Sequence, residues 1–188
     1  MTYAILKRQN ISLGAYTLVS LRKQDMENIR QWRNAQMDVL RQDKVLSPED
    51  QRRYYAEVVV PSFTQPEPHI VLVSFLKNGE CIGYGGLTNI DWQTKRAEVS
   101  FLLDSSRVND TVKYMEEFGI FLELIKELAF KDTGLDRLFT ETYDIRPHHV
   151  SALEARGFVL TGRLRNRVSI KGRMVDSLLH ECSKKDYE

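Results

Sequence analysis

The sequence predicts an α/β sandwich, a single mixed, mainly antiparallel sheet of about seven strands flanked by about four helices. Three strand-like runs within residues 69–104 are separated by turn signals, which is typical of an antiparallel meander. Segments with helical periodicity come before and after that meander. A chain of 188 residues with 42% hydrophobic content can bury one core, so we expect a single domain over residues 1–188.

The chain opens with a strand and a helix. Residues 16–22 (YTLVSLR) predict a strand, and residues 1–15 leave room for a short hairpin before it. Residues 25–35 (DMENIRQWRNA) predict an amphipathic helix, because apolar side chains recur there at helical spacing. The apolar face of this helix would contain Met26, Ile29 and Trp32 or Arg33.

A second helix is predicted to begin at Ser47. Ser47 can cap it, Pro48 suits the first helical position, and Asp50 completes a pattern like a capping box. Residues 60–69 (VPSFTQPEPH) contain three prolines, which we expect to exclude helix and regular strand. This segment is therefore predicted to be a loop.

Two turns divide the central strands. Asn78-Gly79 lies between two apolar runs and is a strong hairpin signal, and residues 91–95 (DWQTK) form the second turn. A long helix follows over residues 110–130, with Asn109 or Asp110 as its cap and Gly134 as its stop. Its predicted apolar stripe consists of Val112, Met115, Phe118, Leu122, Ile125 and Ala129.

The last third predicts a strand, a helix and a closing hairpin. The strand is residues 137–144 (RLFTETYD) and the helix is residues 147–157 (PHHVSALEARG). The hairpin runs from residue 158 to residue 182 with its turn at Lys171-Gly172. The predicted order is therefore β-α-α-β-β-β-α-β-α-β-β.

Charge and composition exclude several classes of protein. A formal net charge of +1 gives no general attraction to nucleic acid or to a membrane surface. The first ten residues lack a signal-peptide pattern, and no apolar run is long enough to span a bilayer, so we expect a cytoplasmic protein. Cys81, Cys182 and the four histidines show no metal-ligand spacing, so no metal site is predicted.

Three stretches carry a resemblance to a known family: residues 21–34 (LRKQDMENIRQWRN), 82–103 (IGYGGLTNIDWQTKRAEVSFLL) and 148–180. Together with the element order, they resemble the GNAT N-acetyltransferase superfamily, in the branch of RimJ/RimL-like ribosomal-protein acetyltransferases. The WRN at residues 32–34 is also similar to amino-sugar-nucleotide acetyltransferases of the PseH type.

The resemblance implies transfer of an acetyl group from acetyl-CoA to a primary amine, such as a protein N-terminus, a polyamine or an amino sugar. The acceptor is thus a small molecule or a peptide, and a homodimer stays open because the sequence does not determine the oligomeric state. In the family the fourth and fifth strands, here residues 97–104 and 137–144, splay apart around the thioester arm of the cofactor. Free backbone groups on the fourth strand hold that arm.

Three residues are candidates for catalysis. Glu98 matches a glutamate common in the branch and is the first candidate for the base, although it could instead be solvated or paired with Arg96. Tyr143 shares a strand face with Glu141 and could reach the splay or face the core. His148 takes the position of an asparagine that contacts CoA in relatives, or lies in an exposed first turn. A tyrosine acid found in many members corresponds to Leu153, which cannot donate a proton.

Residues implied in cofactor binding cluster around the start of the long helix. The family places an arginine- and glycine-rich loop there for the pyrophosphate, but no glycine occurs between Asp104 and Phe118. Arg107 or Lys113 could provide charge instead. The candidate cofactor residues are Phe101, Leu102, Leu103, Arg107, Asn109, Asp110, Thr111, His148 and Ser151.

The candidate acceptor-binding residues are Trp32, Arg33, Tyr84 and Glu141. The glycines around Tyr84, at 83, 85 and 86, could leave room for an acceptor or mark a bulge in the sheet. Arg163, Arg165 and Arg167 alternate along a strand and could meet an anionic acceptor or form a solvated face. The glycine-free loop also favours an alternative, in which the chain is a non-catalytic binding or scaffold module.

Overall fold

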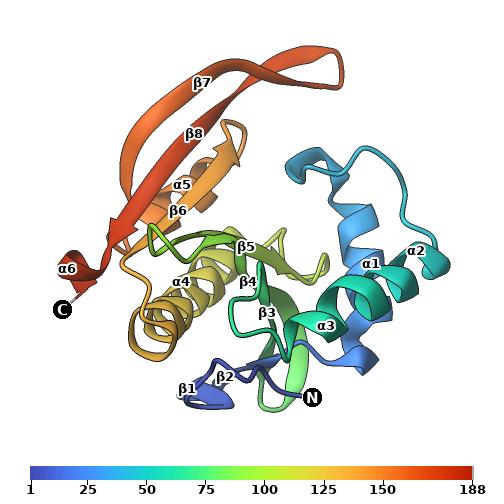
Figure 1. Cartoon of the computed structure of the whole chain (residues 1–188). Helices are drawn as coiled ribbons and strands as arrows, with labels where there is room; N and C mark the ends of the chain where they lie inside the picture. The colour runs from blue at the N-terminus through green and yellow to red at the C-terminus, as the bar shows by residue number, and fades with distance from the viewer. Residues whose placement is uncertain (188) are drawn as a thin grey trace.

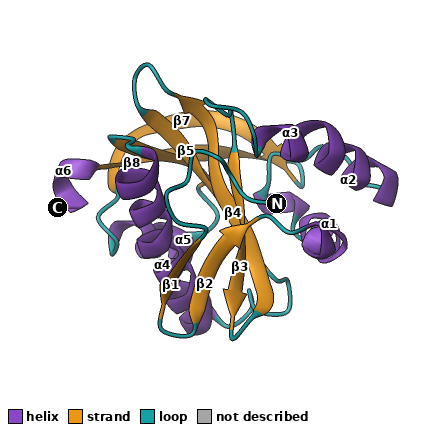
Figure 2. Ribbon diagram, turned by 60° about the horizontal axis from the view of Figure 1, so that its bottom comes forward, coloured by secondary structure: helices purple, strands orange, loops and turns teal. Residues whose placement is uncertain are grey.

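The computed structural model describes residues 1–187 and confirms the α/β sandwich. Eight strands form one sheet in the order β1-β2-β3-β4-β5-β6-β8-β7, and of the neighbouring pairs only β5 and β6 run parallel. Figures 1 and 2 show α1 to α3 on one side of the sheet and α4 with α5 on the other. The strands are β1 (Asn10–Leu13), β2 (Tyr16–Ser20), β3 (Val71–Lys77), β4 (Glu80–Asp91), β5 (Arg96–Leu103), β6 (Arg137–Tyr143), β7 (Val159–Ile170) and β8 (Arg173–Ser183).

The helical segments include two π-helical turns. In chain order they are η1 (Lys23–Asp25), α1 (Met26–Ala35), η2 (Met37–Val39), α2 (Pro48–Tyr54), the π-turn η3 (Tyr55–Val59), α3 (Val60–Ser62), α4 (Thr111–Glu127), the π-turn η4 (Leu128–Thr133), α5 (Pro147–Glu154) and α6 (Lys184–Tyr187). Within residues 1–187, none of these helices has the length and apolar character needed to cross a membrane.

The predicted turns form the expected hairpins. Asn78 and Gly79 connect β3 to β4 with φ values of 51° and 84°, and Lys171 and Gly172 connect β7 to β8 with 48° and 77°. Two consecutive positive φ angles are those of a type I′ turn, whose twist matches that of the flanking strands. The β7–β8 hairpin projects from the body of the molecule (Figure 1).

The predicted helix ends are also confirmed. Ser47 Oγ accepts the backbone N–H of Asp50 at 3.0 Å, and Asp50 returns a hydrogen bond from the backbone N–H of Ser47, which completes a capping box. Asp110 caps α4 by accepting the backbone N–H of Lys113 at 3.0 Å. Gly134 ends the helical segment in the left-handed conformation with φ 74°.

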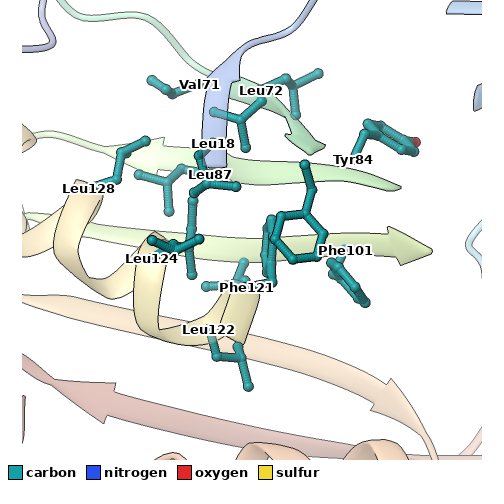
Figure 3. Close-up of a cluster of buried hydrophobic side chains, with 14 of the residues drawn as sticks. Leu18, Val71, Leu72, Tyr84, Leu87, Phe101, Phe121, Leu122, Leu124 and Leu128 are labelled. Carbon is teal, nitrogen blue, oxygen red and sulfur yellow. The ribbon is translucent and has the colours of Figure 1, made fainter. Parts of the chain in front are cut away.

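The core covers both sides of the sheet, with α4 packed on one side and Met26, Ile29 and Trp32 of α1 on the other. Figure 3 shows Phe121 and Leu124 of α4 against Leu87 of β4 and Phe101 of β5. One part of the predicted stripe is wrong, because Val112 is 79% exposed. The buried face begins at Tyr114, two positions later, and two positions turn a helix by about 200° to its opposite side.

The hairpin left open above is present, because residues 10–13 form β1 and pair with β2; with it the expected sheet of about seven strands has eight. One further expectation needs correction. The prolines at 60–69 do not exclude helix, since α3 contains Pro61 and continues to Ser62. Proline removes an amide donor and crowds the carbonyl four residues earlier. The preceding π-turn changes the hydrogen-bond spacing at that point, and so the helix tolerates the ring.

The glycines of β4 are required by the sheet itself. A Cβ on Gly85 would overlap the carbonyl oxygen of Ser100 in β5, and one on Gly86 would overlap the carbonyl oxygen of Val71 in β3. Gly86 also has φ +136°, a conformation that other residues rarely adopt. Close approach of neighbouring backbones therefore accounts for these glycines, and they do not open space for an acceptor.

We predict that Gly86→Ala destabilises the fold far more than Gly14→Ala. Both glycines have positive φ, but a Cβ on Gly14 meets no atom within 4 Å. Gly14→Ala should cost about 1–2 kcal/mol for backbone conformation alone. Gly86→Ala should cost about 1–3 kcal/mol more for the overlap with β3. Urea unfolding of the two variants measures the difference, and equal midpoints would contradict this account of β4.

Candidate active site

The parallel pairing of β5 with β6 is short. The strands pair at Arg96↔Arg137, Ala97↔Leu138 and Glu98↔Phe139, yet β5 continues to Leu103 and β6 to Tyr143. Beyond the last pair each strand is bonded only to its other neighbour, β4 or β8. The two strands therefore diverge after Glu98, at the place where the sequence predicted a splay.

A cavity of about 250 Å³ opens in this splay. Its walls come from residues 98–101 of β5 and 140–143 of β6, and Phe118 of α4 and His149 of α5 also line it. Residues 39–41, from the connection between α1 and α2, form a further part of the wall. Thr140 contributes a buried hydroxyl that has no hydrogen-bond partner within residues 1–187. The cavity thus offers both apolar surface and an unsatisfied polar group.

Glu98 is neither solvated nor paired with Arg96. Its side chain is 5% exposed, and Arg41 Nη2 donates to its Oε1. Asn89 Nδ2 donates to its Oε2 at 2.7 Å. Arg96 instead lies over the ring of Phe139, 4.6 Å from the centroid. Glu98 is therefore a buried carboxylate held at the base of the splay by donors from two other segments.

Glu141 and Tyr143 share one face of β6 and both line the splay cavity. Burial acts to raise the pKa of Glu141, but a hydrogen bond from Arg167 at 2.9 Å and the charge of Arg41 outweigh it and hold the pKa below its ordinary value. Burial raises the pKa of Tyr143, so its phenol is protonated at neutral pH. Tyr143 is half-buried at the cavity and does not belong to the hydrophobic core.

The start of α5 forms a hydrogen-bonded chain with α4. Arg146 Nη2 donates to Tyr114 Oη at 2.6 Å, and Tyr114 Oη lies 2.8 Å from His149 Nδ1. Because a guanidinium only donates, the phenol proton goes to His149 Nδ1 and the imidazole hydrogen is on Nε2. Burial, reinforced by the charge of Arg146, holds the pKa of His149 well below 6.5, so the ring is neutral at pH 7.

His148 occupies a different environment from the one expected. It is His149 that lines the splay cavity, while the His148 ring packs edge-on to Tyr114 with centroids 5.0 Å apart. Burial and the charge of Arg146 lower the pKa of His148 as well. Helix geometry explains the difference, since consecutive residues point about 100° apart and only one of the pair can face the strands.

The charged side chains of the β5–α4 connection are hydrogen-bonded to other groups of the protein. Arg107 Nε donates to Glu117 Oε2 at 2.9 Å and Arg107 Nη2 donates to Oε1, and Lys77 lies 3.4 Å from the same carboxylate. Asp104 accepts the backbone N–H of Ser106 at 2.8 Å, and Asp110 accepts that of Lys113. Carboxylates of the protein therefore already occupy the guanidinium of Arg107 and the backbone N–H groups of Ser106 and Lys113.

The remaining cofactor candidates are divided between core and surface. Phe101 lines the splay cavity, and Leu102 and Leu103 are buried in the core. The Leu103 carbonyl accepts a hydrogen bond from Gln36 Nε2 at 2.8 Å. The exposed candidates are Asn109, Asp110, Thr111 and Ser151.

A second cavity, of about 440 Å³, lies between the α1–α3 layer and β4. Arg33, Thr88 and Ser100 line both cavities, so the two cavities adjoin one another. Arg33 Nη1 donates to Tyr84 Oη at 2.6 Å, and its Nε donates to Gln42 Oε1 at 3.0 Å. Two of the predicted acceptor residues, Arg33 and Tyr84, therefore line this second cavity, while Glu141 lines the splay.

Two other acceptor predictions do not fit the geometry. Trp32 is buried in the hydrophobic core, in agreement with its helical spacing from Met26 and Ile29. The three arginines of β7 do not form a regular stripe, because the register with β8 shifts between Leu164 and Val168. Arg163 pairs with Asp144 and Asp176, and Arg167 pairs with Glu141.

Sequence reasoning missed three residues of the site: Arg41, Arg146 and His149. Arg41 lies in an irregular connection between helices, where periodicity gives no signal. Arg146 immediately precedes a proline at a helix start, a pattern that marks the element boundary and carries no information about charge. His149 lies next to His148 in the same motif. Residues four apart share a helix face, so the apolar Leu153, which is buried, would have indicated that His149 is the inward-facing histidine of the two.

Comparisons with known proteins agree with this architecture. The spermidine N-acetyltransferase from Vibrio cholerae, solved with CoA and spermine, matches 93% of this chain and 99% of its own with TM-score 0.79 and 17% identity. A chimera of that enzyme with hSSAT matches 92% and 98% with TM-score 0.77 and 17% identity. At such identities these similarities establish the fold alone.

Sequence comparison supplies the family. No curated protein gives a significant match. The RimJ/RimL-like branch and the similarity to PseH-type enzymes stay predictions. The model for the acetyltransferase (GNAT) domain matches residues 18–179, which is most of the chain. The chain therefore belongs to the GNAT family of acetyltransferases.

Proposed function

We propose that this protein transfers an acetyl group from acetyl-CoA to a primary amine. The observation that carries the proposal is the splay of β5 and β6, whose cavity contains a buried carboxylate and adjoins a second cavity between the α1–α3 layer and β4. Two adjoining cavities suit a reaction in which a donor and an acceptor bind next to each other. The solved complex of the Vibrio cholerae enzyme with CoA and spermine supports the same class of reaction.

The residues fit one part of the cofactor better than another. The splay cavity, with its apolar wall and the unpartnered hydroxyl of Thr140, suits a narrow arm that carries amide groups. The β5–α4 connection lacks glycine, and its Arg107 is neutralised by Glu117. Acetyl-CoA would supply an activated thioester in the splay, with Phe101 and His149 lining that space.

Glu98 is the proposed base. An acceptor amine with a lysine-like pKa of about 10.4 is protonated at neutral pH and must lose a proton before it attacks a carbonyl carbon. Glu98 is a buried carboxylate at the base of the splay, and Arg41 covers it from the solvent side with a side chain that is 52% exposed. Movement of Arg41 would open Glu98 to the amine or to a bridging water.

Tyr143 is the proposed proton donor to the leaving group. Its phenol lines the splay cavity and is protonated at neutral pH because burial raises its pKa. Leu153 cannot take this role, since it is a buried hydrocarbon side chain. His149 keeps a neutral ring with its Nδ1 accepting from Tyr114, and so we assign it to shaping the cavity.

The second cavity favours an acceptor that carries an anionic group besides its amine. The guanidinium of Arg33 is hydrogen-bonded to two neutral groups and has no carboxylate partner within residues 1–187. Arg53, by contrast, pairs with Asp50 at 3.1 Å. Glu57 is the carboxylate of this cavity that has no ion-pair partner among the described residues. An amino acid, a peptide terminus or a phosphorylated amino sugar fits these charges better than a polyamine, which would need several free carboxylates.

Loss of catalysis is the second candidate. It is favoured by the neutralised Arg107 and by Asp110 at the start of α4, which occupies a backbone donor at the usual phosphate position. In that case the chain would be a GNAT-fold binding or scaffold protein. A cytoplasmic location and a homodimer stay predictions under either function.

Acetyl-CoA should raise the thermal unfolding midpoint. A ligand at a hundredfold excess over its Kd stabilises the native state by about 2.7 kcal/mol. For a chain of this size that is a shift of about 5–10 °C. Differential scanning fluorimetry with up to millimolar acetyl-CoA measures it. Absence of any shift in a folded sample would exclude the acetyltransferase and favour the scaffold function.

Glu98→Gln should lower kcat by about 100-fold or more, because the amide keeps the shape but cannot accept the proton. The Kd for acetyl-CoA should stay within about threefold, since no bond to the cofactor is removed. Release of the free thiol reports the rate with whichever amine is active. Glu141→Gln is the matched control, because Arg41 also contacts that carboxylate, and its effect on kcat should be much smaller. An unchanged kcat in Glu98→Gln removes Glu98 from the mechanism.

Arg33→Gln should raise the KM for acceptors with a carboxylate or phosphate by about tenfold or more, the typical loss of one charge-assisted hydrogen bond. The KM of the same amines without the anionic group should change little. Arg53→Gln is the control, since Arg53 lines the same cavity but is neutralised by Asp50. If a polyamine is the best acceptor and Arg33→Gln improves it, the proposed acceptor class is wrong.

A further inference from the structure

We propose that Arg146 binds the pyrophosphate of the cofactor and so takes the place of the arginine that the β5–α4 connection would otherwise supply. This inference rests on the proposed use of acetyl-CoA. It concerns a residue outside that connection, at the junction of β6 with α5.

The nearest alternative, Arg107, is already used inside the protein. Both oxygens of Glu117 accept hydrogen bonds from Arg107, and the side chain of Glu117 is fully buried. Burial acts to raise the pKa of Glu117, but the bonds and charges of Arg107 and Lys77 outweigh it and hold the carboxylate ionised. To release Arg107 to a phosphate would leave Glu117 buried with only Lys77 beside it, which is strongly unfavourable.

Arg146, unlike Arg107, is not paired with a carboxylate among the described residues of the protein. It lines the splay cavity and is half-buried, yet within residues 1–187 it has no carboxylate partner. Its contacts are the phenol oxygen of Tyr114, at 2.6 Å from Nη2, and the face of the same ring, 5.7 Å from centroid to Cζ. A half-buried charge without a counter-ion is costly, and an anionic ligand would remove that cost.

The position of Arg146 is fixed from both sides. Its backbone carbonyl accepts the N–H groups of His149 and Val150, which starts α5, and Pro147 restricts the backbone of Arg146 before it. Tyr114, which holds the guanidinium, is buried in α4 only four residues after its cap Asp110. Arg146 is thus held beside the first turns of α4, where the family resemblance implies that a cofactor pyrophosphate docks.

The donors that remain suit a phosphate group. A guanidinium has five N–H donors, and the bond to Tyr114 uses one of them. The neighbouring His149 is neutral and bonded to Tyr114, so it does not occupy the remaining donors of Arg146. The free edge of the guanidinium can therefore form paired hydrogen bonds with two phosphate oxygens.

The test compares ligands with and without the pyrophosphate. Calorimetry would measure the Kd of CoA, 3′-dephospho-CoA and pantetheine for the wild type, Arg146→Met and Arg107→Met. We expect Arg146→Met to weaken CoA and 3′-dephospho-CoA by about 10- to 100-fold, the range for hydrogen bonds to a charged group. Pantetheine should bind within about twofold of the wild type. Arg107→Met should lower the unfolding midpoint but leave the Kd of CoA within about threefold.

Each other outcome is decisive. If Arg146→Met binds CoA like the wild type, or loses pantetheine equally, Arg146 does not bind the pyrophosphate. If the loss vanishes with 3′-dephospho-CoA, the contact is to the 3′-phosphate and the proposal is wrong. If the wild type binds neither CoA nor pantetheine, the proposed acetyl transfer itself fails. Unfolding midpoints measured without ligand separate these outcomes from misfolding. Arg146→Lys keeps the charge and is expected to restore part of the affinity.

Discussion

The divergence of β5 from β6 is the constraint on which the rest of this molecule depends. Parallel strands bonded along their length would leave no space between them, but here the bonding stops after Glu98. Each strand keeps its other partner, so the sheet stays intact while a gap opens in its middle. The cost is a set of strand edges whose backbone groups face the gap, and these are the groups that a bound ligand can satisfy.

The charges near the gap are of two kinds. Some are neutralised within the protein, as with Glu98 by Arg41, Glu141 by Arg167, and Glu117 by Arg107. Others, Arg33 and Arg146, have only neutral partners among residues 1–187. A buried ion pair already has both of its charges compensated and is not stabilised further by a ligand, whereas an unpaired cation is stabilised by an anionic ligand. The distinction that we propose between binding residues and structural residues therefore rests on pairing, which residue type alone does not reveal.

Local signals in the sequence predicted most of the fold. The hairpin at Asn78-Gly79, the capping box at Ser47 and the stop at Gly134 all depend on a few adjacent residues and were confirmed. The error at Pro61 arose from a local irregularity of the helix. Pro61 was tolerated because of a π-turn, which has no clear sequence pattern.

The site was predicted in outline and not in its contacts. The location of the splay and the presence of Glu98 in it followed from the family resemblance. The partner of Glu98 is Arg41, 57 residues away, and no periodicity relates the two. The pairing of Arg107 with Glu117 depends on how the connection folds back over α4, and this geometry cannot be read from spacing. Long-range side-chain pairs of this kind require the tertiary structure.

The connection between α1 and α2 contributes residues to the walls of both cavities. Residues 39–41 line the splay, and Lys44 and Leu46 line the second cavity. Its attachments to the rest of the molecule include Gln36 on Leu103, Arg41 on Glu98, and Asp38 at 2.5 Å from Lys171 on the β7–β8 hairpin. One short stretch of chain is thus shared by the proposed donor and acceptor sides. A substitution within it would therefore affect both sides, so a change in acceptor preference should be accompanied by a change in donor affinity.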